Sequence, residues 1–295
     1  MKVREAIGLQ GLAAARALIR RLHLRNLDRG AQQLAASTDL EIEGAEGPLP
    51  ARLYVPALEA GGGSHPLLVY FHGGGFVLCD IDSHDALCRR LAAASGMRVL
   101  SVGYRLAPEH RFPAMHRDAA AAWTWARRHA GELGADPERI GLGGDSAGGH
   151  MAAWLALRGE ARPAFLALFY PLLDVGEDEW LGSPLKDLRF LGRAAVGYIR
   201  RQIEDFEAEG GLNDFRLAGR DLSGLPPTVL VETGLDPLKP GIRAFADDLR
   251  QAGVRVEHLS FPMLAHGAFN FAYVSHGAAQ ALENAGEALR CVVES

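Results

Sequence analysis

The sequence has few cysteines and no long hydrophobic run. Its 3 cysteines, Cys79, Cys88 and Cys291, show no CxxC spacing, which argues against a disulfide framework, a redox pair or a thiolate metal site. The N-terminal segment carries Arg16 inside its apolar stretch and has no signal-peptide cleavage pattern. No segment approaches the ~20 apolar residues that a membrane span needs. We therefore expect a cytoplasmic protein with no stable membrane insertion.

An excess of charge of one sign is also missing. The chain has 31 Lys and Arg against 36 Asp and Glu, a formal net charge of −5. Nucleic-acid binding needs clustered basic residues, so no nucleic-acid partner is expected. The 11 histidines show no H-E-x-x-H or comparable ligand spacing, and no glycine pattern typical of nucleotide loops opens a helix. We expect neither a metal nor another cofactor.

What the sequence does have is a regular alternation of short apolar runs and helical patterns. Continuous apolar strands that alternate with helices indicate an α/β fold, with a central, mostly parallel sheet covered by helices on both faces. Two alternating segments before this region, 38–44 and 50–56, predict an antiparallel pair at a sheet edge. The predicted strands are 66–72, 97–104, 139–144, 164–173, 227–234 and 254–261; the predicted helices are 83–96, 114–131, 147–158, 241–252 and 276–293.

Two further segments predict a helical cap on a single domain that spans 1–295. The N-terminal segment has apolar residues at helical spacing, and we expect this helix to pack on its own protein, with a membrane-surface helix as the alternative. The alternation lapses between about 175 and 215 into acidic, irregular sequence, which we interpret as an insertion. The cap is expected to combine about 1–40 with about 175–215.

The sequence Gly144-Asp145-Ser146-Ala147-Gly148 fits the G-x-S-x-G pattern of a nucleophile elbow. It lies between a predicted strand and a predicted helix, where a serine in a strained positive-φ conformation lifts its Oγ clear of the sheet. The flanking glycines let strand and helix approach each other. An ordinary Gly/Ser turn is the alternative, but this placement favours a catalytic serine.

A catalytic serine needs a base and an acid, which follow in the order Ser, acid, His in this fold. Asp236 comes just after one predicted strand and His266 after the next, so both fall at the same sheet edge as Ser146. Asp174 is a weaker candidate for the acid. His72 and His150 are expected to form hydrogen bonds with loop backbone. Four further polar side chains are also expected to be structural: Asp247, Asp248, His258 and His276.

Five sequence motifs occur in a fixed order along the chain. They are "HGGG" (72–75), "YRLAPEHRFPA" (104–114), "GDSAGG" (144–149), "DPL" (236–238) and "HG" (266–267). With them the chain resembles the hormone-sensitive-lipase-like carboxylesterases over roughly residues 65–290. The resemblance implies an α/β-hydrolase fold with a helical cap and cofactor-free ester hydrolysis.

The same resemblance implies roles for individual residues. It assigns the nucleophile to Ser146, the acid to Asp236 and the base to His266. It also assigns an oxyanion hole to the backbone N–H groups of Gly73, Gly74 and Ala147. The third glycine of the triplet, Gly75, is expected only to permit the turn.

The chain departs from the family pattern at a few positions near these motifs. Gly103 precedes Tyr104 where an acidic residue is usual, Pro240 lies where acidic residues commonly follow "DPL", and Ala268 stands where an aromatic often follows "HG". The predicted function is hydrolysis of short- to medium-chain acyl esters. The alternatives are a non-catalytic small-molecule receptor and a hydrolase of amides, lactones or arylformamides. A homodimer is left open.

Overall fold

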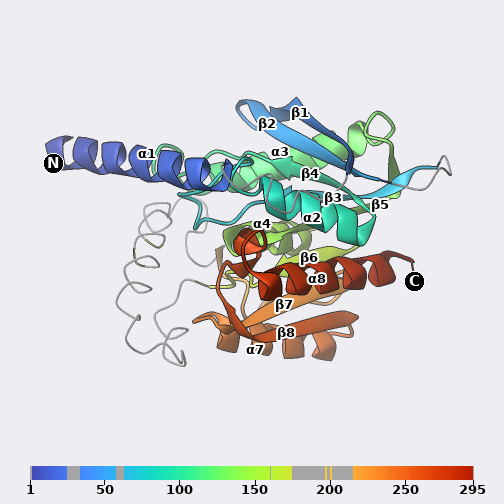
Figure 1. Ribbon diagram of the computed structural model, residues 1–295. Helices are drawn as coiled ribbons and strands as arrows, with labels where there is room; N and C mark the ends of the chain where they lie inside the picture. The colour runs from blue at the N-terminus through green and yellow to red at the C-terminus, as the bar shows by residue number, and fades with distance from the viewer. Residues whose placement is uncertain are drawn as a thin grey trace.

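The chain folds around one eight-stranded sheet, seen in a computed structural model that describes residues 2–24, 34–57, 63–159, 161–174, 197, 200 and 215–294. The strands lie in the order β1-β2-β4-β3-β5-β6-β7-β8 (Figure 1). Their bounds are β1 Leu34–Gly44, β2 Gly47–Pro56, β3 His65–Phe71, β4 Arg98–Val102, β5 Ala135–Asp145, β6 Leu166–Phe169, β7 Thr228–Leu235 and β8 Val256–Ala265. Every predicted strand is present.

The sheet is antiparallel at one edge and parallel elsewhere. β1 pairs with β2 and β2 with β4 in antiparallel register, and all the remaining neighbours are parallel. Because parallel strands end at the same edge of a sheet, the chain leaves β3, β5, β7 and β8 on one side of the molecule. This confirms the predicted fold class and the antiparallel edge pair.

Helices cover both faces of the sheet. α2 and α8 pack against each other in front of the strands, while α4 and α7 lie behind them (Figure 1). A short 3₁₀ segment, η4, follows β8 closely. The bounds are α1 Lys2–Leu24, α2 Asp85–Ser95, α3 Ala114–Arg128, α4 Ala147–Leu157, α7 Lys239–Gln251, η4 Ala268–Phe271 and α8 His276–Glu294.

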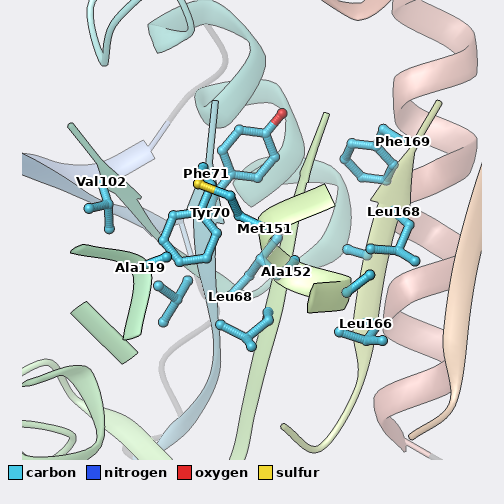
Figure 2. Packing of buried hydrophobic residues seen from close by; sticks show 14 of the residues in the cluster. Leu68, Tyr70, Phe71, Val102, Ala119, Met151, Ala152, Leu166, Leu168 and Phe169 are labelled. Carbon is cyan, nitrogen blue, oxygen red and sulfur yellow. The ribbon is translucent and has the colours of Figure 1, made fainter. Parts of the chain in front are cut away.

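The core lies between the helices and the central strands. β3 and β6 are buried almost throughout, as expected for strands covered on both faces. Figure 2 shows part of this core, in which Leu68 of β3, Met151 of α4 and Leu166 of β6 belong to one cluster of buried side chains. This packing fixes α4, and with it the turn that precedes α4, against the sheet.

The predicted cap is described only in part. α1 is present and contacts the rest of the chain through Arg16, in agreement with a helix that packs on its own protein. β1 begins at Leu34, so the N-terminal range of about 1–40 assigned to the cap includes the start of the sheet. The insertion predicted over about 175–215 lies almost entirely outside the described residues. Among the described helices, none is long and apolar enough to cross a membrane.

Candidate active site

Ser146 lies on a sharp turn between β5 and α4. Its backbone has φ 52° and ψ −113°, a left-handed conformation that a residue with a Cβ rarely adopts. A Cβ added to Gly144 or to Gly148 would overlap the carbonyl oxygen of Phe71 in the neighbouring strand. The two glycines therefore allow β5, β3 and α4 to come close enough to hold Ser146 in this conformation.

Three side chains from separate strand ends meet at this turn. His266, directly after β8, places its Nε2 2.9 Å from Ser146 Oγ. Asp236, directly after β7, places its Oδ2 2.8 Å from His266 Nδ1. The structure thus brings together the serine, histidine and aspartate that the sequence singles out, in one hydrogen-bonded line.

The aspartate of this line is fully buried and held on both oxygens. Its Oδ1 accepts a hydrogen bond of 2.8 Å from the Leu238 amide, and its Oδ2 accepts one of 3.0 Å from Thr233 Oγ1. Burial disfavours the charged imidazole, but the adjacent Asp236 carboxylate more than offsets this and raises the pKa of His266 above its usual value. The arrangement favours a histidine that can accept a proton and carry its charge.

The predicted oxyanion donors do not all have a free N–H. The amide of Gly73 donates to Asp145 Oδ1 at 2.8 Å, and a Cβ on Gly73 would overlap that same carboxylate. Gly73 therefore holds the loop to the nucleophile turn, and its predicted assignment as an oxyanion donor does not agree with this bond. Within the described part of the chain, the amides of Gly74, Gly75 and Ala147 have no hydrogen-bond partner.

Asp145, the residue before the serine, is the centre of a buried network that the sequence does not reveal. Its Oδ1 accepts hydrogen bonds from Tyr70 Oη (2.7 Å) and from the Gly73 amide, and it lies 3.2 Å from His84 Nε2. Asn270 Nδ2 lies 3.1 Å from the same His84 nitrogen and 3.5 Å from Asp145 Oδ2. Although burial opposes ionisation, His84 and these hydrogen bonds lower the pKa of Asp145.

The two histidines that flank the site bind loop backbone, as expected. His72 Nδ1 donates to the Gly73 carbonyl oxygen at 2.8 Å, and His150 Nδ1 donates to that of Leu172 at 2.9 Å. Burial lowers the pKa of His72 to about 4 and that of His150 to about 3. Both rings are therefore neutral at physiological pH.

The weaker candidates lie away from the line of Ser146, His266 and Asp236. Asp174 pairs with Arg216 at 2.6 Å, and His258 lies 3.4 Å from Glu232. His276 is the first residue of α8, and Asp247 and Asp248 are exposed on α7. Each has a structural position consistent with the sequence interpretation.

The departures from the family pattern have local explanations. Gly103 donates its amide to the Pro50 carbonyl oxygen at 2.8 Å, and an added Cβ would lie 3.0 Å from that oxygen. Pro240 falls in the first turn of α7, where its missing N–H removes no helical hydrogen bond. Ala268 is buried at the start of η4. Within the described part of the chain, none of the three makes a side-chain hydrogen bond to Asp236 or His266.

The described residues contain no group of three or more His, Cys, Asp and Glu side chains placed to hold a metal ion. The chemistry that these residues can supply is proton transfer and nucleophilic attack by Ser146 Oγ. Burial raises the pKa of the Cys79 thiol to about 12, so this thiol stays protonated at neutral pH.

The chain is similar to a known protein family and to characterised esterases. Residues 68–270 match the family described as alpha/beta hydrolase fold. The chain is 37% identical to a carboxylic ester hydrolase, LipN, of Mycobacterium tuberculosis over 96% of this chain and 78% of the relative. It is 33% identical to an ethyl acetate hydrolase of Pseudomonas putida over 88% and 81% of the two chains.

Solved structures agree with the sequence relatives. An esterase of Pyrobaculum calidifontis superposes with a TM-score of 0.83 at 31% identity, covering 95% of this chain and 92% of that one. The family match, the relatives and the shared fold lead to one conclusion. The chain belongs to the α/β-hydrolase family, among its hormone-sensitive-lipase-like carboxylesterases.

Proposed function

We propose that the protein hydrolyses carboxylic esters with short- to medium-chain acyl groups through Ser146, His266 and Asp236, by way of an acyl-enzyme. The observation that carries the proposal is the continuous line Ser146 Oγ, His266 Nε2, His266 Nδ1, Asp236 Oδ2, with contacts of 2.9 and 2.8 Å. Such contacts are short enough for direct proton transfer. The names of the esterase relatives support the same reaction class.

In the acylation step, His266 Nε2 takes the hydroxyl proton of Ser146 as Oγ bonds to the ester carbonyl carbon. The carbonyl oxygen becomes an oxyanion in the tetrahedral intermediate. When the intermediate collapses, the bond to the alcohol oxygen breaks, and His266 gives its proton to the departing alkoxide. Asp236 orients the imidazole and stabilises its charged form throughout, which is consistent with the raised pKa of His266.

The developing negative charge needs backbone donors next to Ser146. We propose the amides of Gly74, Gly75 and Ala147 for this role, because Gly73 already donates to Asp145. Ala147 is the first residue of α4, where a free N–H and the helix dipole both favour an anion. Removing one such donor typically costs on the order of 10²–10³ in rate.

Deacylation repeats the same chemistry with water. His266 takes a proton from the water molecule, whose oxygen attacks the acyl carbon and forms a second tetrahedral intermediate. The bond to Ser146 Oγ then breaks, the serine recovers its proton from His266, and the carboxylic acid leaves.

We also propose that α1 and the insertion near 175–215 form a cap that influences acyl-chain preference.

The test is turnover of p-nitrophenyl acetate, butyrate and octanoate by wild type and by Ser146→Ala. We expect turnover of the shorter esters by wild type and a loss in kcat of about 10⁶ in the variant. Ser64→Ala, in an exposed loop, is the matched control and should keep wild-type rates. Undiminished hydrolysis by Ser146→Ala would exclude the proposed nucleophile. No turnover by the wild type would favour a non-catalytic receptor.

A further inference from the structure

Arg16 of α1 reaches across the surface to two backbone carbonyls and a carboxylate. Its Nε donates to the Val77 carbonyl oxygen at 2.7 Å, and its Nη2 donates to that of Ala107, also at 2.7 Å. The guanidinium also pairs with Glu109 at 2.8 Å. The side chain is only 22% exposed, although it projects from a surface helix. One side chain thus joins α1 to two loops that lie 61 and 91 residues further along the chain.

The first of these loops carries the proposed oxyanion donors and is conformationally strained. Gly74 and Gly75 have φ values of 114° and 63°, and the non-glycine residues Phe76 and Cys79 have φ values of 63° and 69°. Positive φ is unfavourable for a residue with a Cβ and persists where surrounding contacts impose it. Within the loop, the Gly74 carbonyl oxygen accepts hydrogen bonds from the amides of Val77 and Leu78. Further support has to come from outside the loop.

Besides the bond from the Gly73 amide to Asp145, external support for this loop comes from the second loop and from Arg16. The Ala107 amide donates to the Phe76 carbonyl oxygen at 2.9 Å. Arg16 then binds the Ala107 carbonyl and, beyond Phe76, the Val77 carbonyl. The backbone at residues 76 and 77 is therefore held by the Ala107 amide at Phe76 and by Arg16 of α1 at Val77. A planar guanidinium with several fixed N–H groups can serve both carbonyls and Glu109 at once, which a lysine ammonium cannot do with the same geometry.

We propose that Arg16 is a positioning residue for catalysis, which holds the loop of Gly74 and Gly75 in its strained, oxyanion-binding conformation. Docking of α1 is in this way coupled to the completeness of the active site. The inference rests on the proposed function, because Arg16 would act on catalysis only by positioning the proposed oxyanion donors. Arg16 itself touches no reacting atom.

The helix provides a matched control for this inference. Arg21 lies five residues further along α1, is exposed, and makes no ion pair or hydrogen bond with the part of the chain that the structure describes, unlike its neighbour Arg20, which pairs with Asp82. Arg16→Met and Arg21→Met remove the same charge from the same helix. Arg16→Lys keeps the positive charge but loses the planar guanidinium with its several N–H groups. Glu109→Gln leaves both carbonyl contacts in place while weakening the ion pair.

The experiment measures steady-state kinetics with p-nitrophenyl butyrate on the full chain. We expect Arg16→Met to lower kcat by about tenfold to a hundredfold with KM within about twofold of wild type, because misplaced oxyanion donors weaken binding of the transition state. The acid limb of the pH profile should stay unchanged, since His266 and Asp236 are untouched. Arg16→Lys should recover part of the loss, Glu109→Gln should lose less than Arg16→Met, and Arg21→Met should match wild type.

Hydrogen exchange gives a readout that needs no turnover. The amides of Val77 and Leu78 donate to the Gly74 carbonyl oxygen, and the Ala107 amide donates to that of Phe76. All three amides should exchange faster in Arg16→Met than in Arg21→Met. Equal kcat or equal exchange in the two variants would overturn the inference, even while Ser146→Ala stays inactive and the proposed function stands. An inactive wild type would overturn the proposed function instead. If Arg16→Met does not fold, the comparison of Arg16→Lys, which cannot serve both carbonyls with the same geometry, with Arg21→Met decides in the same way.

Discussion

His266 Nε2 lies 2.9 Å from Ser146 Oγ, although 120 residues separate the two in the chain. Their strands, β8 and β5, are not neighbours, because β6 and β7 lie between them in the sheet. The contact is possible because each residue follows the carboxyl end of a parallel strand, and all those ends face the same side. The site therefore depends on the register of the whole parallel half of the sheet.

The pH dependence of activity should follow His266. The base must be neutral to take the proton of Ser146, so kcat/KM should rise with pH and fall away as pH drops through the pKa of His266. Because Asp236 raises that pKa, half-maximal kcat/KM is expected above the ordinary histidine value near 6.5. A profile with its acid limb well below pH 6 would contradict this.

Asp236→Asn should lower activity and move the same limb. Without this carboxylate only the weaker attraction of Asp145 opposes the burial of the imidazole, so the pKa of His266 should fall and the acid limb should shift to lower pH. The loss in kcat is expected to be about 10³–10⁴. Both quantities come from one kcat/KM profile against pH. An unshifted limb would show that Asp236 does not set the pKa of His266.

Gly74→Ala should damage catalysis while leaving the acid–base pair intact. The position has φ 114°, and an added Cβ would overlap the Leu78 carbonyl oxygen, so the loop must move. We expect kcat/KM to fall by about 10²–10³, with the acid limb unchanged. Gly219→Ala is the control, because Gly219 also has a positive φ (74°) but open space around it. Similar losses in both variants would indicate general backbone strain instead.

Asp145→Asn should destabilise the fold. The change takes a charged acceptor away from the buried Tyr70 hydroxyl and the Gly73 amide, which is expected to cost on the order of 3 kcal/mol of unfolding free energy. Asp247→Asn, on the exposed face of α7, should change that free energy by less than about 0.5 kcal/mol. Urea unfolding at neutral pH measures both.

The difference in stability between wild type and Asp145→Asn should depend on pH. The pKa of Asp145 is lower in the folded state than its ordinary value of 3.8, so its contribution is fully present above that value. The contribution is lost as pH falls through the folded pKa. The gap in unfolding free energy between wild type and Asp145→Asn should therefore narrow on acidification. A gap that widens towards low pH would contradict the assignment.

Much of the fold and of the site could be predicted because the requirements are local. A parallel strand covered on both faces needs a continuous apolar run, and β3 and β6 show this directly. A nucleophile elbow needs glycine two residues before and after the serine, which Gly144 and Gly148 supply. Asp236 and His266 could be found because strand ends are visible in the sequence as the points where apolar runs stop.

The remaining features depend on contacts between distant residues. Gly73 binds Asp145, 72 residues away, and Asn270 reaches Asp145 across 125 residues. Asn270, like Arg16, carries no motif of its own. No local pattern indicates which glycine of a triplet has its amide already bonded. The bond from the Gly73 amide to Asp145 therefore becomes visible only in the three-dimensional packing. The same holds for the network around His84.

The most direct test of the central claim is to identify the residue that a phosphonate ester modifies covalently as it inactivates the enzyme. The protein is treated with a p-nitrophenyl phosphonate ester, and samples are taken for residual activity and for peptide mass spectrometry. We predict one phosphonyl group on the peptide that contains Ser146, accumulating in step with the loss of esterase activity. Esterase activity that persists in fully labelled protein, or inactivation with the label on another residue, would contradict the account.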